Sequence, residues 1–221
     1  GVRDCFRFKL YLGLALSAIA IALFAFASEP LIRLYLNEEN AEARIAMTLG
    51  HGQDYLNVML FGLVPFALSQ AYASTLRETG ETALPMRAGI MAVLINLSLN
   101  YVLIYGHFGF PAMGVRGAAL ATIISRYAEL FVIAVATQRR PERFKFICGA
   151  FRSPRVPMKL VKQIAIKGSP LLINEALWSF GIAMIARCYS MRGLDVVSAL
   201  NISNTVSNLF NTVFLSMGSA T

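Results

Sequence analysis

The chain has 221 residues, of which 57% are hydrophobic and 14% are charged, and its formal net charge is +8. Soluble domains carry about 25% charged residues, so this composition excludes an ordinary water-soluble protein. The mean hydropathy of +0.59 instead predicts an integral membrane protein. The chain starts at Gly1 and stops at Thr221 inside an apolar helical pattern, from which we expect an internal part of a longer protein.

Apolar segments recur along the chain at a length that suits a bilayer. A membrane core takes about 20 apolar residues of helix, and six segments meet this length, at 10–28, 55–74, 86–105, 117–137, 170–189 and 197–217. The sequence therefore predicts an all-α integral membrane protein with six transmembrane helices. Pro65 and Pro170 lie in the second and fifth spans, where they would permit the helices to bend.

The distribution of Lys and Arg predicts the orientation of these spans, because both residues concentrate in cytoplasmic loops. With the chain start inside, fourteen basic residues lie on the cytoplasmic side and five outside. Nine of the fourteen lie between the fourth and fifth spans. We predict first-lobe spans in residues 1–137, a basic cytoplasmic connector at 138–167, and the start of a second lobe at 168–221. The connector should rest near anionic headgroups rather than bind nucleic acid, with an interfacial helix after Pro157.

Three ionisable residues lie well inside the predicted spans, where a charge costs at least about 2.5–3.5 kcal/mol on insertion scales. Arg126 and Glu129 are three residues apart on one helix, so they share a face and can neutralise each other. They form either a structural pair or part of a coupling mechanism. Glu175 has no cation among its helical neighbours. It therefore pairs with a cation on another helix or binds a proton or a sodium ion.

A stripe of amides marks the last predicted span. On a helical wheel its four asparagines fall within about 80° of arc: Asn201, Asn204, Asn208 and Asn211. Amides facing lipid would be unsatisfied, so this stripe either bonds to other helices or lines a cavity that solvates an ion or a substrate. Asn96 and Asn100 form a smaller pair on the third span, and we expect them to join helices rather than to act as ligands.

No enzyme signature accompanies these features. The sequence has no phosphate-binding Walker loop, and no Ser-His-Asp or Cys-His arrangement can be argued. His51 and His107 lack metal-ligand spacing. We therefore expect neither an enzyme nor a bound cofactor, and no metal other than transient sodium at Glu175.

The stretch from Leu76 to Arg126 carries the most specific pattern. It contains LRETGETALPM, then NLSLNYVLIYGHFGFPAMGVRGAALAT. This order and spacing resemble the multidrug and toxic compound extrusion family of cation-coupled exporters, whose pattern is roughly LRGxGxTxxPM followed by NxxLNYxLIFGxFGxPxxGVxGAAxAT. Glu78 stands where that family usually has glycine.

The resemblance implies twelve spans in two lobes of six, joined by a cytoplasmic connector. It also implies an antiporter, driven by Na⁺ or H⁺, that exports organic cationic or amphipathic compounds by alternating access. Family members place an acidic residue in the seventh span as part of the cation and substrate site, which corresponds here to Asn174 and Glu175. We expect a monomer in a bacterial inner membrane. The alternative is a lipid-linked saccharide flippase of the same superfamily, which should need more cations in its cavity.

Overall fold

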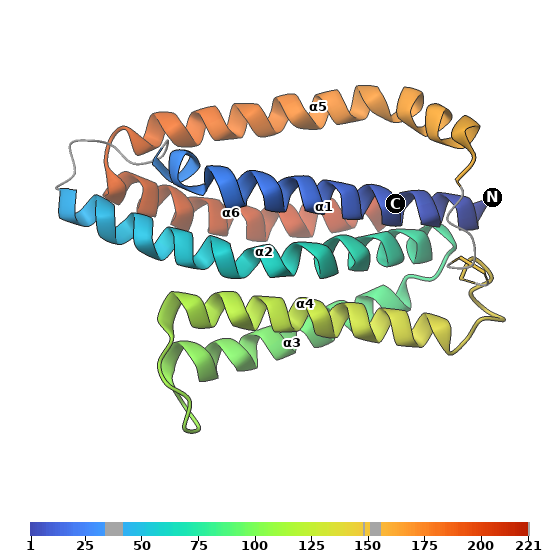
Figure 1. The fold of residues 1–221 in the computed structure, drawn as a ribbon, viewed down its shortest axis with the longest axis horizontal. Coiled ribbons are helices and arrows are strands. Elements are labelled where there is room, and N and C mark those ends of the chain that lie inside the picture. The colour runs from blue at the N-terminus through green and yellow to red at the C-terminus, as the bar shows by residue number, and fades with distance from the viewer. Residues whose placement is uncertain (34–41, 148, 151–155, 221) are drawn as a thin grey trace. The chain divides into compact units, whose positions relative to one another are not determined.

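The computed structural model describes residues 1–33, 42–147, 149–150 and 156–220, and the regular elements in these residues are all α-helices (Figure 1). The helices are α1 (Val2–Arg33), α2 (Glu42–Glu78), α3 (Ala83–Tyr105), α4 (Gly114–Gln138), α5 (Met158–Ser190) and α6 (Leu194–Ala220). Each predicted span lies within one of these helices. The all-α fold predicted from the sequence is therefore confirmed.

Five of these helices contain segments long and apolar enough to cross a membrane. The segments are Val2–Ser28, Tyr55–Glu78, Ala83–Tyr105, Gly114–Gln138 and Met158–Ser190. The described residues of α6 do not contain such a segment, because the asparagines of this helix lower its mean hydropathy. The predicted span at 197–217 is thus helical, and its passage through the membrane stays a prediction.

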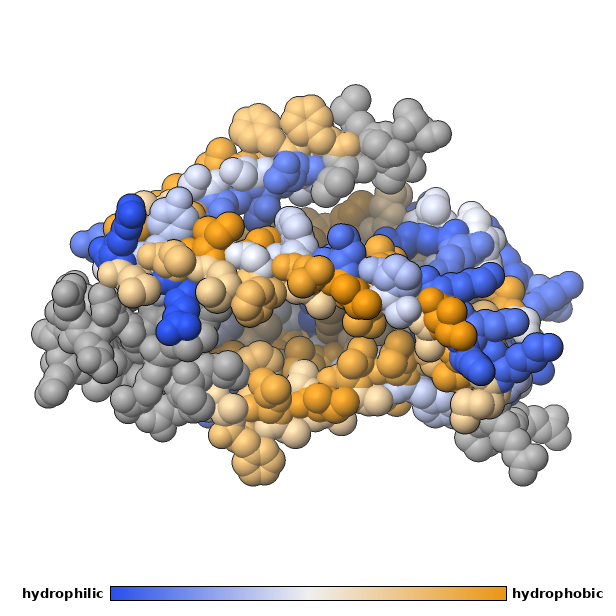
Figure 2. Space-filling view, turned by 90° about the horizontal axis from the view of Figure 1, so that it is seen from above, coloured by the Kyte–Doolittle hydropathy of each residue, from blue (hydrophilic) through white to orange (hydrophobic). Residues whose placement is uncertain are grey.

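Large apolar side chains remain exposed along the helices. Phe26 on α1, Phe61 on α2 and Phe131 on α4 are 91%, 72% and 68% exposed. Figure 2 shows orange apolar side chains over much of the surface in view, beside patches of blue hydrophilic side chains. Extended apolar surface of this kind marks contact with a membrane or with other protein. The exposed side chains therefore agree with helices that cross a bilayer.

The chain divides into two compact units, residues 1–28 with 51–168 and residues 29–50 with 169–221. In the first unit, α3 and α4 form a hairpin in which small residues permit close packing. A Cβ atom added at Gly117 would lie only 2.6 Å from the carbonyl oxygen of Leu103. Ala119 and Ala121 on α4 are also fully buried. The missing side chain at Gly117 lets the two backbones approach closely, as expected for paired membrane helices.

The turn between α3 and α4 depends on one glycine. Gly106 has φ 73°, in the left-handed region that favours glycine. Its N–H donates to the carbonyl of Val102 over 3.0 Å and caps α3. A Cβ atom at Gly106 would lie 2.6 Å from the backbone nitrogen of Ala112, so the turn also closes too tightly for any side chain there.

Aromatic packing joins the start of α1, the end of α2 and the segment after α4. Phe6 is fully buried, and its ring centroid lies 4.9 Å from that of Tyr72 and 5.2 Å from that of Phe146. The guanidinium of Arg7 is also buried here. Its Nε and Nη2 atoms donate to the carbonyls of Ala150 and Gly149 over 2.7 and 2.5 Å. The described part of the connector is therefore fastened to α1.

Among the described residues, two ion pairs at this same end of the first unit join separate elements. Lys9 Nζ lies 2.6 Å from Glu78 Oε1, which joins α1 to α2. Arg143 pairs with Glu81 and so joins the connector to the turn before α3. Lys9 and Arg143 are both among the basic residues that the charge distribution places on the cytoplasmic side. Glu78, where the resemblance would place glycine, here serves as the partner of Lys9.

The helices are longer than the apolar windows that predicted them. The loop expected between the first two spans is partly helical, since α1 continues to Arg33 and α2 begins at Glu42, and residues 34–41 lie outside the described part. An interfacial helix and a span were predicted as separate elements after Pro157, whereas the structure has the single helix α5 with Pro170 inside it. Proline is tolerated in membrane helices because neighbouring groups satisfy the freed carbonyl.

The close approach at Gly117 leads to a stability prediction. Gly117→Ala should lower the free energy of unfolding by about 1–3 kcal/mol, because the added methyl group meets the Leu103 backbone and forces α3 and α4 apart. The measurement is the thermal midpoint of the purified full-length protein. Gly89→Ala is the control, since a Cβ atom there has no neighbour within 4 Å among the described residues. Equal midpoints for both variants would contradict the packing account.

Candidate functional site

Polar side chains of α3 and α4 gather around a small pocket in the first unit, which we call the mid-span cluster. The pocket has a volume of about 300 Å³, and its lining residues are Gly89, Ala92, Val93, Asn96, Thr122, Ser125, Arg126 and Glu129. The spacing of the sequence explains this arrangement. Thr122, Arg126 and Glu129 follow the 3.6-residue period and therefore share one face of α4.

An ion pair forms the charged part of the mid-span cluster. Arg126 Nη1 lies 3.0 Å from Glu129 Oε2, and the two side chains are 39% and 10% exposed. Arg126 is at the middle of α4, so at 1.5 Å per residue it lies about 18 Å from either end. Its guanidinium carbon also lies 5.1 Å from the ring centroid of Phe66 on α2, a favourable cation–π distance. The pair thus lies deep in the span with each charge compensated.

The amide groups of the cluster connect α3 to α4. Asn96 Nδ2 donates to Thr122 Oγ1 over 3.4 Å, and Asn100 Nδ2 donates to Asn96 Oδ1 over 3.0 Å. Thr122 in turn donates to the carbonyl of Ala118 over 2.9 Å. The Asn96 bond agrees with the expectation that this residue joins helices, whereas the Asn100 bond lies within α3. Among the described residues, the buried Asn100 Oδ1 atom has no donor.

The remaining predicted site residues lie in the second unit. Asn174 and Glu175 are exposed on α5. Within the described residues Glu175 forms no ion pair, in contrast to Glu129. The asparagine stripe is exposed along α6, at Asn201, Asn204, Asn208 and Asn211. The structure therefore brings Arg126 and Glu129 together, and the roles of Glu175 and the stripe stay predictions.

Sequence reasoning missed three members of the site region. Thr122 and Ser125 line the pocket, and Phe66 lies beside the Arg126 guanidinium. A signal for Thr122 was present, because it precedes Arg126 by four residues and must share its face. No local pattern could have identified Phe66, which comes from another helix. In the described part of the chain, no group of three or more His, Cys, Asp and Glu residues could hold a metal ion.

Comparison with known proteins gives a consistent set of relatives. A family model described as MatE matches residues 1–102. The chain is 31% identical over 208 residues to a protein named probable multidrug resistance protein NorM from Thermotoga maritima. The aligned part covers 91% of this chain and 43% of that relative.

Two further relatives agree with the first. A probable multidrug resistance protein YoeA from Bacillus subtilis is 29% identical over 167 residues, with 76% of this chain and 36% of the relative covered. A probable multidrug resistance protein NorM from Geobacillus kaustophilus is 27% identical over 215 residues, with coverages of 96% and 45%. The chain thus spans less than half the length of these relatives.

The mid-span ion pair can be tested with a double-mutant cycle. Glu129→Gln should lower the free energy of unfolding of the full-length protein by about 1–3 kcal/mol, because it leaves the Arg126 charge uncompensated inside a span. The double variant Arg126→Gln/Glu129→Gln removes both charges. The unfolding free energy lost in the double variant should be smaller than the sum of the losses in Arg126→Gln and Glu129→Gln by about 0.5–3 kcal/mol. Thermal midpoints supply the measurement, and strictly additive losses would rule out a stabilising pair.

Proposed function

Because the chain belongs to the multidrug and toxic compound extrusion family, we propose that it forms part of a cation-coupled antiporter. In this proposal, an inward gradient of Na⁺ or H⁺ drives export of organic, cationic or amphipathic drugs and toxins across a bacterial inner membrane. The names of the relatives, which describe multidrug resistance proteins, support export of drugs. The helices apolar enough to cross a membrane support a multi-pass carrier.

The contrast between two acidic residues carries the proposal. Glu129 has its charge partner on the same helix, with 3.0 Å between its Oε2 atom and Arg126 Nη1. Glu175 is exposed on an apolar helix, and no described residue forms an ion pair with it. An antiporter needs a group within the membrane that a coupling ion and a substrate occupy in turn. We assign this exchange to Glu175 and a structural or coupling role to Arg126 and Glu129.

Neutral polar groups would complete the site. The amides of Asn174 and of the α6 stripe offer donors and acceptors without a fixed charge, which suits substrates of varied chemistry. Alternating access would expose this site to each side in turn as two lobes rock about it. The protein would act as a monomer in the lipid bilayer, and nucleic acid would not be a partner.

The flippase alternative needs cations that can hold a pyrophosphate group within the cavity. In the described spans, the cation at mid-depth is Arg126, and Glu129 already compensates it. This observation favours the exporter.

The first functional prediction concerns Glu175. Glu175→Gln in the full-length protein should reduce efflux of a fluorescent organic cation about tenfold or more, because a lost charged contact costs about 1.5–3 kcal/mol. Efflux is followed from cells that lack their own pumps, with and without sodium. Sodium dependence of the wild-type rate would identify the coupling ion.

Glu142→Gln provides the matched control, since Glu142 is an exposed carboxylate in the connector. We expect this variant to export at the wild-type rate. Unchanged efflux in an equally expressed Glu175→Gln protein would show that Glu175 has a structural role instead. Absence of efflux from well-expressed wild type would favour the flippase.

The second functional prediction concerns the asparagine stripe. Asn208→Ala should raise the KM for export about two- to tenfold, because one neutral hydrogen bond contributes about 0.5–1.5 kcal/mol. The effect should differ between compounds, since the amide would contact the substrate directly. Ser203→Ala is a control from the same helix, off the stripe. Identical changes in both variants for every compound would contradict a cavity wall formed by the stripe.

A further inference from the structure

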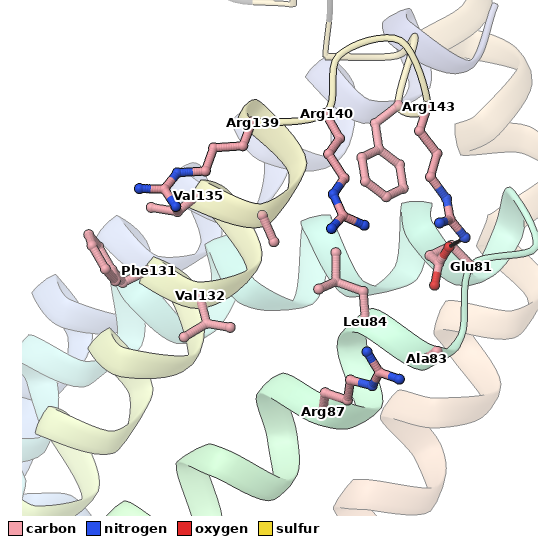
Figure 3. Close-up of a pocket in the computed structure, with 12 residues that line it drawn as sticks. Glu81, Ala83, Leu84, Arg87, Phe131, Val132, Val135, Arg139, Arg140 and Arg143 are labelled. Atoms are coloured by element: carbon pink, nitrogen blue, oxygen red, sulfur yellow. Dashed lines mark hydrogen bonds and ion pairs between the residues drawn. The ribbon is translucent and has the colours of Figure 1, made fainter.

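We propose that a second pocket, distinct from the mid-span cluster, binds the phosphate headgroup of an anionic phospholipid. This arginine pocket lies at the start of α3 and the end of α4 and has a volume of about 540 Å³ (Figure 3). Its polar lining consists of Glu81, Arg87, Arg139, Arg140 and Arg143, and its apolar lining includes Leu84, Phe131, Val132 and Val135. The proposal does not depend on which compounds the protein transports.

Positive charge in the pocket exceeds negative charge. Arg143 pairs with Glu81, which neutralises both. Among the described residues, Arg87, Arg139 and Arg140 form no ion pair. Figure 3 shows the side chains of Arg140 and Arg87 extending into the space on either side of Leu84, while Arg139 extends beside Val135. Guanidinium groups that line one pocket repel one another, and a phosphate that accepts hydrogen bonds from them would reduce the repulsion.

The first turn of α3 adds to the attraction for an anion. The Thr82 side chain forms no capping hydrogen bond, and the next two residues, Ala83 and Leu84, line the pocket. The first backbone N–H groups of a helix have no partner within the helix, and the positive end of its dipole favours negative charge. The arginines therefore line a pocket that also contains a helix N-terminus, whose dipole favours an anion even though Pro85 supplies no N–H group.

The apolar wall indicates a lipid rather than free phosphate. Phe131 is 68% exposed and lies eight residues before Arg139 on α4, which corresponds to about 12 Å along the helix. Val132 and Val135 continue this wall toward the arginines. An acyl chain can lie along these side chains while its headgroup contacts the guanidinium groups. In the predicted orientation the pocket lies at the cytoplasmic leaflet, where anionic lipids concentrate.

The test uses the purified full-length protein in detergent and measures its thermal midpoint as lipid is added. Phosphatidylglycerol should raise the midpoint, whereas phosphatidylcholine and inorganic phosphate at equal ionic strength should not. In Arg87→Gln/Arg140→Gln, the phosphatidylglycerol concentration for half-maximal stabilisation should rise about tenfold or more. The single variant Arg140→Gln, from the exposed segment after α4, should show a smaller rise and serves if the double variant does not fold.

Lys159→Gln/Lys162→Gln is the matched control, because it removes two exposed charges on the same predicted side without touching the pocket. We expect it to respond to phosphatidylglycerol like the wild type. An equal loss of response in this control would show general surface attraction and overturn the proposal. Stabilisation of the wild type by inorganic phosphate alone would also overturn it, by showing that the acyl chain contributes nothing.

Discussion

Hydrocarbon supplies no partner for a hydrogen bond or a charge, and this constraint explains most of the structure. It requires helices that satisfy their own backbone, and it requires each polar side chain in a span to find a partner inside the protein. Glu129 forms an ion pair with Arg126, and Asn96 donates a hydrogen bond to Thr122. Thr122 in turn donates to the Ala118 carbonyl. The mid-span cluster is therefore a set of groups that satisfy most of one another's needs, while the neighbouring Asn100 Oδ1 atom has no donor among the described residues.

Close packing between α3 and α4 makes these partnerships geometrically feasible. Gly117 lets α4 approach the Leu103 carbonyl, and Gly106 closes the turn that sets the register of the two helices. At the other end of the hairpin, Phe6 and Arg7 hold the connector against α1. The same hairpin thus positions two different polar sites, one at mid-depth and one at the membrane edge.

The sequence predicts interactions between residues that are close together in the chain, and it does not predict those between residues that only the packing of helices brings together. Hydropathy located an apolar segment within each described helix, and three-residue spacing placed Arg126 beside Glu129. Hydropathy could not show that α2 begins at Glu42, because a helix that leaves the bilayer loses its apolar signal while its backbone bonds continue. The sequence also did not predict the arginine pocket. Arg87 and Arg140 are remote in sequence, and only the packing of α3 against α4 brings them to one pocket.

The compensated charges of Arg126 and Glu129 have an electrical consequence. Moving one elementary charge across the membrane against 100 mV requires about 2.3 kcal/mol, but an ion pair has no net charge on which the voltage can act. While the pair keeps its orientation, α4 can shift along the membrane normal without net electrical work from these two charges. A neutral side chain in place of Glu129 would uncover one positive charge near mid-membrane, and any motion of α4 along the membrane normal would then become sensitive to membrane voltage.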